Sequence, residues 1–242
     1  MAPKHQLNVE SFPESAAHVV RKLADVMHRL NDVNPILDLI KGLPGDPGAV
    51  IAACDLWDPT ALTLVSNSSE KVTSMAKQVT DTWTGDAAKH FTEFMVGDKR
   101  THSVTQTIND AVDVLSKVSQ SLLDLYGIIL GTYKKCVGYL GECSKTLLKL
   151  LSGISAAVGE NVSIDSKKLS INIFAAGAQA EKAINDAISD FITIVNKAYG
   201  DAIDDLLKDQ KTLHGMMDTV ARMPRPDQIP DTVEDSSLFH PK

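Results

Sequence analysis

The stretch Trp83-Thr84-Gly85-Asp86-Ala87-Ala88-Lys89-His90-Phe91 decides the fold of this chain. On both sides of its first three residues, apolar side chains recur every three or four positions, which is the spacing of an amphipathic helix. A glycine accepts backbone angles that other residues resist, and a large indole fills the end of a pair of helices. The stretch therefore predicts a tight turn between two long antiparallel helices.

The composition of the 242-residue chain agrees with long helices. Hydrophobic residues make up 43% and aromatic residues only 5%, which suits narrow seams between helices better than a thick core. Of the ten prolines, none lies between Thr60 and Met223. The net charge of -7, without a basic patch, argues against duplex DNA or RNA as a partner.

The chain is expected to begin with a short helix. Ser11-Phe12-Pro13-Glu14 is typical of a helix start, with Ser11 as the cap, and Asn34-Pro35 is expected to break or kink this helix. Residues 42–48 then form a turn rich in glycine and proline.

A second helix is expected after this turn. Asp46 is its predicted cap, Pro47 lies in its first turn, and Asp58-Pro59 marks a kink or a restart. Its predicted seam contains Ile51, Trp57, Ala61, Leu62, Val65, Val72, Met75, Val79 and Trp83.

The return helix is expected to begin after Gly85, to be interrupted near Gly97-Asp98 and to run far past Ile129. Two such segments joined by a tight turn predict an antiparallel hairpin resembling a coiled coil. The fold class is therefore all-α, an elongated antiparallel hairpin or bundle of long helices. The seam of the return helix is predicted to contain Ala87, Ala88, Phe91, Phe94, Val104, Ile108, Val112, Leu115, Val118, Leu122, Leu125 and Ile129.

Residues 160–173 alternate between apolar and polar side chains, which predicts a short β-hairpin or an extended turn at a tip. A last long helix is expected from about Phe174 to Met223, followed by an acidic, proline-rich tail that is disordered or extended. The sequence thus divides into an N-terminal helix and turn, a Trp-x-Gly hairpin, an extension with the last helix, and the tail, at residues 1–44, 45–130, 131–223 and 224–242.

No catalytic or metal-binding constellation is expected. The seven histidines are scattered, and His90 with Glu93 lacks a second pair to complete a metal site. Phosphate-binding glycine loops, nucleophile elbows and zinc-protease motifs are absent from the sequence. Cys54, Cys136 and Cys143 are interpreted as small buried hydrophobic residues. We therefore expect no enzyme activity, no cofactor and no metal.

The stretch Trp83–Phe91 resembles the turn of the WXG family, the small helical-hairpin substrates of type VII secretion systems in Gram-positive bacteria. In that family the Trp-x-Gly turn is followed by small residues and then an aromatic. Upstream, Gly45-Asp46-Pro47-Gly48-Ala49 followed by Trp57 looks like the longer actinobacterial members and the N-terminal modules of their secreted toxins. The resemblance covers about residues 45–130.

The resemblance implies a non-enzymatic protein in which Trp83 and Gly85 set the hairpin and Phe91 packs behind them. It implies export by the type VII machinery, from the cytoplasm to the cell surface or medium. The segment Met1–Glu10 has no apolar signal core, which agrees with export without a classical signal peptide. The implied partner is a second hairpin protein or another copy of this chain.

One feature of the family is missing. Its secretion signal is a tyrosine followed four residues later by an acidic residue, and no tyrosine here has that partner. The candidate degenerate signal is Tyr199 with Asp204, one position late, and the nearby Asp201 and Asp205. The alternatives are that Tyr199 is an ordinary seam residue, that a partner supplies the signal, or that this chain is not a substrate.

Two other functions stay open at this point. Residues 122–159 are rich in apolar and small side chains, which fits either a buried core or a segment of an α-helical pore former that enters membranes. The second open function is that of a cytosolic adaptor or chaperone for a secreted toxin.

Overall fold

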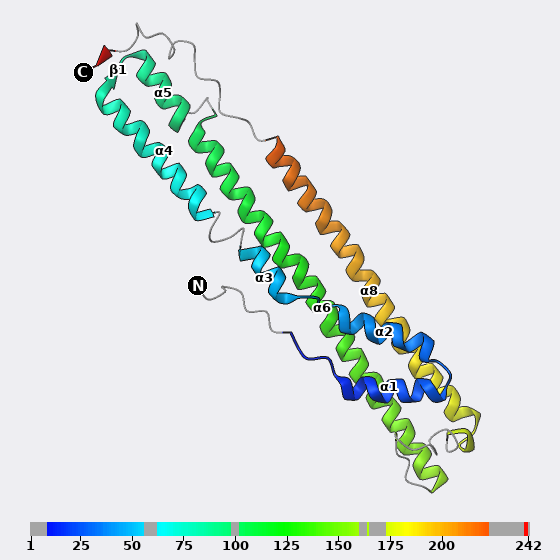
Figure 1. Cartoon of the computed structure of the whole chain (residues 1–242). Helices are drawn as coiled ribbons and strands as arrows, with labels where there is room; N and C mark the ends of the chain where they lie inside the picture. Colours follow the sequence, from blue (N-terminus) through cyan, green and yellow to red (C-terminus); the bar gives the residue numbers. More distant parts are fainter. Residues whose placement is uncertain are drawn as a thin grey trace. The chain divides into compact units, whose positions relative to one another are not determined.

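A computed structural model of the chain describes residues 9–55, 62–97, 102–159, 164, 173–222 and 240–241. The protein is all-α, as the sequence predicts, and its long helices pack against one another (Figure 1). The helices are α1 (Glu14–Val26), α2 (Leu30–Gly42), α3 (Pro47–Asp55), α4 (Leu62–Thr82), α5 (Asp86–Val96), α6 (Val104–Val158) and α8 (Ala178–Ala221). Two very short strands are β1 (Trp83–Thr84) and β2 (His240–Pro241).

The chain forms two compact units, and each combines separated segments. Unit 1 contains Gly48–Asp124 and the end of the chain from Lys208, and unit 2 contains Gln6–Pro47 and Leu125–Leu207. Helices α6 and α8 therefore contribute one part to each unit. The division expected from the sequence, by contrast, follows continuous segments of chain.

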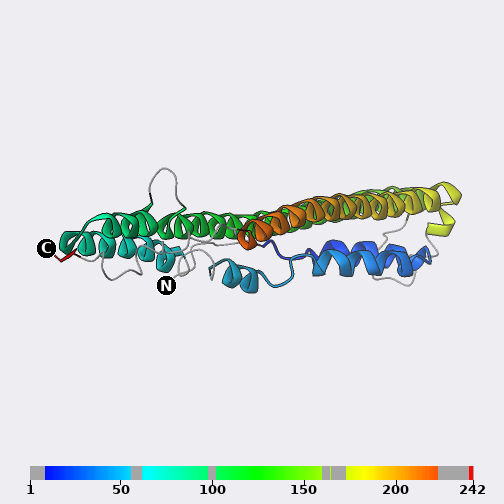
Figure 2. The ribbon, with the colours of Figure 1, turned by 90° about the horizontal axis from the view of Figure 1, so that it is seen from above.

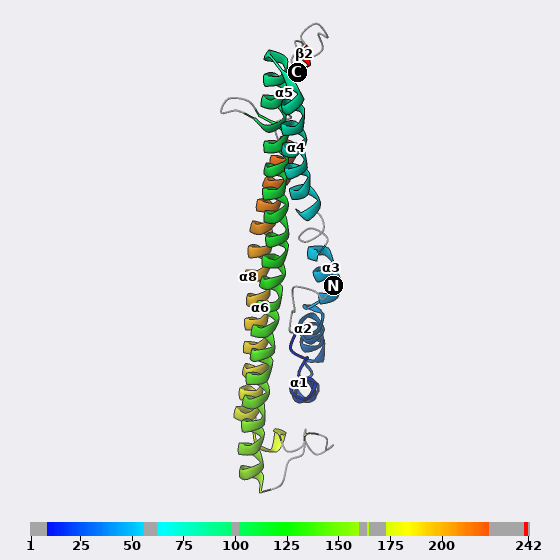
Figure 3. The ribbon, with the colours of Figure 1, turned by 90° about the vertical axis from the view of Figure 1, so that its left-hand side faces the viewer.

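Unit 2 is built around the paired helices α6 and α8, which lie side by side (Figure 3). The helices α1 and α2 form a second layer on one side of this pair (Figure 2). Side chains spaced three or four residues apart fill the core, as expected for helices packed through a continuous seam. The α6 and α8 residues of this core are Tyr133, Cys136, Leu140, Cys143, Leu147, Leu151, Ile154, Ile184, Ile188, Phe191 and Val195.

The break in the N-terminal helix lies earlier than the sequence indicates. Helix α1 ends at Val26, and His28 takes a left-handed conformation with φ of 56°. The amide of His28 donates to the Asp25 carbonyl (3.0 Å) and the amide of Arg29 to the Ala24 carbonyl (2.7 Å). This pair of bonds is a Schellman motif, which ends a helix.

Of the break or kink predicted at Asn34-Pro35, the break is therefore wrong. Pro35 lies inside α2 and is exposed, while four apolar neighbours on the same helix are buried. Their packing keeps the helix continuous despite the lost backbone hydrogen bond. The four buried residues are Val33, Ile36, Leu37 and Ile40.

The predicted cap of the first helix is also wrong. Helix α1 begins at Glu14, its N-cap position is Pro13, and no side chain makes a capping hydrogen bond there. Ser11 lies outside the helix and is exposed. Glu14 instead accepts a hydrogen bond from Lys41 of α2 (2.6 Å), which ties the first turn of α1 to the last turn of α2.

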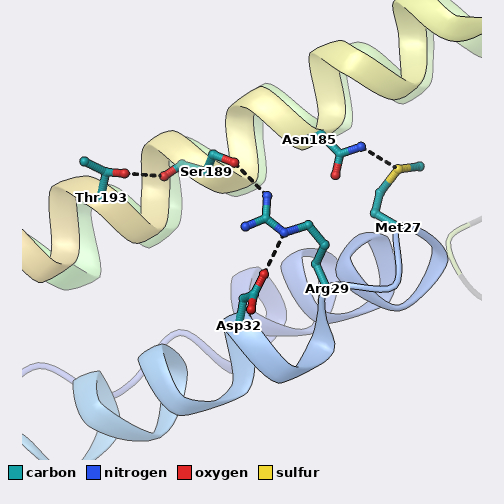
Figure 4. A network of polar contacts seen from close by, with 6 residues as sticks. All are labelled: Met27, Arg29, Asp32, Asn185, Ser189 and Thr193. Atoms are coloured by element: carbon teal, nitrogen blue, oxygen red, sulfur yellow. Dashed lines mark hydrogen bonds and ion pairs between the residues drawn. The ribbon is translucent and has the colours of Figure 1, made fainter.

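A polar network fastens the α1–α2 corner to α8 within unit 2 (Figure 4). The Arg29 guanidinium donates from Nε to Asp32 (2.8 Å) and from Nη1 to the Ser189 hydroxyl (2.6 Å). Next to it, the Asn185 amide donates to the sulfur of Met27 (3.6 Å). The corner is thus held in place by directional bonds as well as by apolar contact.

Unit 1 contains the predicted hairpin. Helices α4 and α5 lie next to each other and are joined by β1 (Figure 1). Gly97, with φ of 93°, ends α5, as expected for an interruption at that position. The next helix, α6, starts at Val104 and continues to Val158. Ser103 caps its start, because the Ser103 hydroxyl accepts a hydrogen bond from the Gln106 amide (3.1 Å).

The seam of α4 differs from the predicted one at Met75. Met75 is 61% exposed, and its neighbour Ala76 is fully buried. The inward face of α4 therefore contains Val65, Ser69, Val72, Ala76 and Val79, and Trp83 follows directly after the helix with the same spacing of three or four. Trp57, Ala61 and the Asp58-Pro59 restart lie outside the described residues.

Other expectations agree with the structure or fall outside it. Helix α3 begins at Pro47, directly after Asp46, and α8 covers most of the predicted last helix. Cys54, Cys136 and Cys143 are buried thiols that form no disulfide, which confirms their interpretation as small buried residues. The predicted β-hairpin at 160–173 and the tail at 224–242 lie almost entirely outside the described residues.

Replacing His28 by glycine is expected to stabilise unit 2. A left-handed backbone costs a residue with a side chain about 1–2 kcal/mol, whereas glycine adopts it freely. Because glycine also gains freedom in the unfolded chain, the net increase in the free energy of unfolding should be about 1 kcal/mol. Urea unfolding would measure it, with His28→Ala as the control that keeps the strain. Equal midpoints for both variants would contradict this assignment.

The buried thiols are expected to be unreactive in the native protein. Burial raises the pKa of the Cys143 thiol to about 12 and also raises the pKa of Cys136. Because the thiolate is the reactive form, a disulfide reagent at pH 8 should label both cysteines only when the core opens. The folded state retains these protons longer than the unfolded state, so stability should fall as the pH rises above about 9. Rapid labelling of Cys143 in the native protein, detected by mass spectrometry of its peptides, would disprove this protection of the thiols.

Candidate interaction sites

The Trp-x-Gly turn lies between two helices, as the sequence predicts. Helix α4 ends at Thr82, Trp83 and Thr84 are extended, and α5 starts at Asp86. Gly85 has φ of 99° and ψ of -175°, a conformation that is nearly restricted to glycine. Its carbonyl accepts the first bond of α5, from the Lys89 amide (3.2 Å). Gly85 is therefore the residue that lets the chain reverse direction.

Aromatic contact closes the end of the hairpin. The rings of Trp83 and Phe91 lie 5.8 Å apart between centroids, tilted by 49°. This is the separation of a favourable aromatic pair. Ala87 and Ala88 are buried beside them, so that α5 presents small side chains to α4. The structure thus brings together all three predicted turn residues, Trp83, Gly85 and Phe91.

The end of the chain also reaches this turn. The strand β2 pairs antiparallel with β1, with Pro241 opposite Trp83 and His240 opposite Thr84. The contact lies within unit 1. It is not apparent from the sequence, because nothing in the tail pattern marks these two residues as a strand.

One flank of α4 carries exposed apolar side chains. Leu64 is 64% and Met75 is 61% exposed. They are 11 residues apart, which places them on the same side of the helix, three turns from each other. This flank lies about 90° from the inward face, so it is free to contact another helix.

The structure does not bring Tyr199 and Asp204 together. Tyr199 lies half-buried in α8 and lines a pocket of about 500 Å³ that also includes Leu39 of α2 and Ile129 of α6. Asp204 is exposed. A separation of five residues rotates it by about 140° around the helix, away from Tyr199. Ile203, at the expected distance of four, lines the same pocket as Tyr199.

Two tyrosines of α6 have structural contacts that sequence reasoning missed. The Tyr126 hydroxyl donates to the Pro44 carbonyl (3.0 Å), and the Tyr133 hydroxyl donates to the Glu10 carbonyl (2.8 Å). Burial raises the pKa of both phenols, helped by the negative charge of Asp46 near Tyr126 and of Glu10 near Tyr133. Their spacing of seven along one helix face is the only local signal, and it does not identify the acceptors.

The apolar segment 122–159 contributes to the core of unit 2 from Leu125 onward. Leu140, Leu147, Leu151 and Ile154 are buried there, while Leu148 is exposed. Insertion into a membrane would require these contacts to open. No described helix has the length and the apolar character needed to cross a bilayer.

The described residues contain no group of three or more His, Cys, Asp or Glu side chains placed to hold a metal ion. His90 contacts Glu93 (3.3 Å) on the surface of α5. Comparison of the chain with protein-family models, with curated proteins and with solved structures found no match.

Replacing Gly85 by alanine is expected to weaken the hairpin. A methyl group at Gly85 would meet no neighbouring atom, so the cost comes from the backbone conformation alone, about 1–3 kcal/mol. Hydrogen exchange of the amides in α4 and α5 would detect the easier opening. Gly153→Ala is the matched control, because Gly153 has an ordinary helical backbone with open space around it, and it should be neutral or slightly stabilising. Unchanged exchange in Gly85→Ala would refute the role of the turn.

Proposed function

We propose that this chain is a non-enzymatic helical hairpin protein of a type VII secretion system, exported to the cell surface or medium. It acts through association of its helices with another copy or with a second hairpin protein. The observation that carries the proposal is the turn itself. Gly85 in a conformation nearly restricted to glycine and the Trp83–Phe91 contact join two antiparallel helices. These are the roles that the resemblance to the WXG family assigns to the three residues.

The surface of α4 supports a role in association. Large apolar side chains are costly to leave in water, and Leu64 and Met75 are among the most exposed in the described chain. Isolated exposed apolar residues are common, but two on one flank of a helix form the kind of anchor pair that a partner helix uses. The hairpin thus offers one face to its own α5 and another to a partner.

Export of this chain does not require a complete secretion signal within the chain itself. Tyr199 faces a pocket together with Ile203, and Asp204 lies elsewhere on the helix surface. If the chain is exported with a second hairpin protein, the partner supplies the tyrosine and acidic residue. Under this proposal, Tyr199→Phe leaves export unchanged.

Export would be tested by fractionating the native organism with and without an active type VII secretion ATPase. The chain should appear in the medium or at the surface only when the ATPase is active. Trp83→Ala should lower the ratio of exported to cytosolic protein, because the hairpin end loses its aromatic contact, whereas Trp83→Phe should retain most of it. Retention in the cytosol of both strains would overturn export and favour the role of a cytosolic adaptor.

A further inference from the structure

The extended residues of the Trp-x-Gly turn have a second strand beside them. Helix α4 ends at Thr82, and Trp83 and Thr84 form β1. Strand β2 lies antiparallel to β1 within unit 1 (Figure 1). Backbone N–H and C=O groups of extended residues find their partners on a neighbouring strand rather than within a helix. The turn therefore has an edge at which an extended segment binds through its backbone.

The proline in β2 determines which residues exchange hydrogen bonds. Pro241 lies opposite Trp83, and a proline has no amide hydrogen to donate. In an antiparallel ladder, hydrogen-bonded pairs alternate with pairs that exchange no hydrogen bonds. Trp83 and Pro241 are thus a pair of the second kind, and Thr84 and His240 are the hydrogen-bonded pair. Recognition at this edge needs one backbone donor and one backbone acceptor opposite Thr84.

The contact between the two strands is short and therefore easily opened. It contains two residues on each side, and an isolated pair of strands is only marginally stable in water even when it is longer. The 17 residues from Met223 to Phe239 connect β2 to the end of the helical region at Arg222. A segment linked to its own site competes there at an effective concentration of about millimolar. A weak strand can thus occupy the edge within its own chain and still exchange with another segment.

The charges near the turn restrict which segment can replace β2. Asp81 and Asp86 flank β1, and both are exposed. The residues from Ser236 to Lys242 contain no acidic side chain. Acidic residues occur only earlier in the part of the sequence that follows α8, at Asp227, Asp231, Glu234 and Asp235. The segment that pairs with β1 thus comes from the stretch without negative charge, as expected beside two aspartates.

We propose that β1 is a binding site for an extended, non-acidic peptide segment of a partner protein, and that β2 is its built-in competitor. The partner segment adds a strand to β1 and pairs with Thr84 once β2 has left. In this mode the affinity comes from main-chain bonds, so many side chains are tolerated. The site lies at the end of the hairpin and is distinct from the exposed flank of α4.

Hydrogen exchange at the Thr84 amide, followed by NMR in the full chain, tests whether β2 closes the site. His240→Pro removes the amide that pairs with Thr84, so the Thr84 amide should exchange at least about tenfold faster than in the parent. Pro241→Ala is the matched control, because it replaces a residue that exchanges no hydrogen bond, and Thr84 should stay protected. Equal exchange in the parent and in His240→Pro would overturn the role of β2.

A synthetic peptide with the sequence of residues 236–242 tests the site itself. Added at millimolar concentration to the His240→Pro chain, it should slow exchange at Thr84 again. It should bind the parent about tenfold more weakly, because β2 competes there. The control is the same peptide with proline in place of His240, which should not bind. Absence of peptide binding to His240→Pro, or equal binding to both chains, would overturn the proposal. Because the test uses the purified chain, neither result depends on export.

Discussion

Burial of one apolar side chain every three or four residues along α6 and α8 is the interaction on which unit 2 depends. Each helix contributes a single row, from Tyr133 to Ile154 on α6 and from Ile184 to Val195 on α8. The helices α1 and α2 complete the core from one side. Because the rows are narrow, the opposite side of the pair is left with a groove rather than a filled core.

In unit 1 the same principle works with smaller side chains. Ala76 of α4 and Ala87 and Ala88 of α5 are buried, so the two helices gain little from any one contact. The end of the pair is therefore important, and it is fixed by Gly85 and by the aromatic pair Trp83 and Phe91. The turn at the end of the hairpin is thus set by one backbone conformation, that of Gly85, and by one ring contact, that of Trp83 with Phe91.

Local signals predicted much of this architecture. The Trp-x-Gly turn and the length of α6 follow from glycine chemistry and from the absence of proline. The sequence does not reveal the break after α1, because the left-handed position is taken by His28 rather than by a glycine. The helix continues through Pro35 because the buried residues of α2 stabilise it. Met75 was misplaced because it and Ala76 both fit the spacing after Val72. Long-range contacts could not be predicted from the sequence. The hydrogen bonds from Tyr126 to Pro44 and from Tyr133 to Glu10 join residues that are 82 and 123 positions apart. The groove likewise requires α6 and α8 to be paired in register.

The proposed function has two parts, export from the cell and pairing of the helices with another chain. Native mass spectrometry of the protein recovered from the culture medium of its own organism would test both parts at once. We expect an exported complex heavier than the 26.1 kDa chain, either a dimer or a pair with a second helical protein. Absence from both the medium and the cell surface, or recovery only as a monomer, would contradict it.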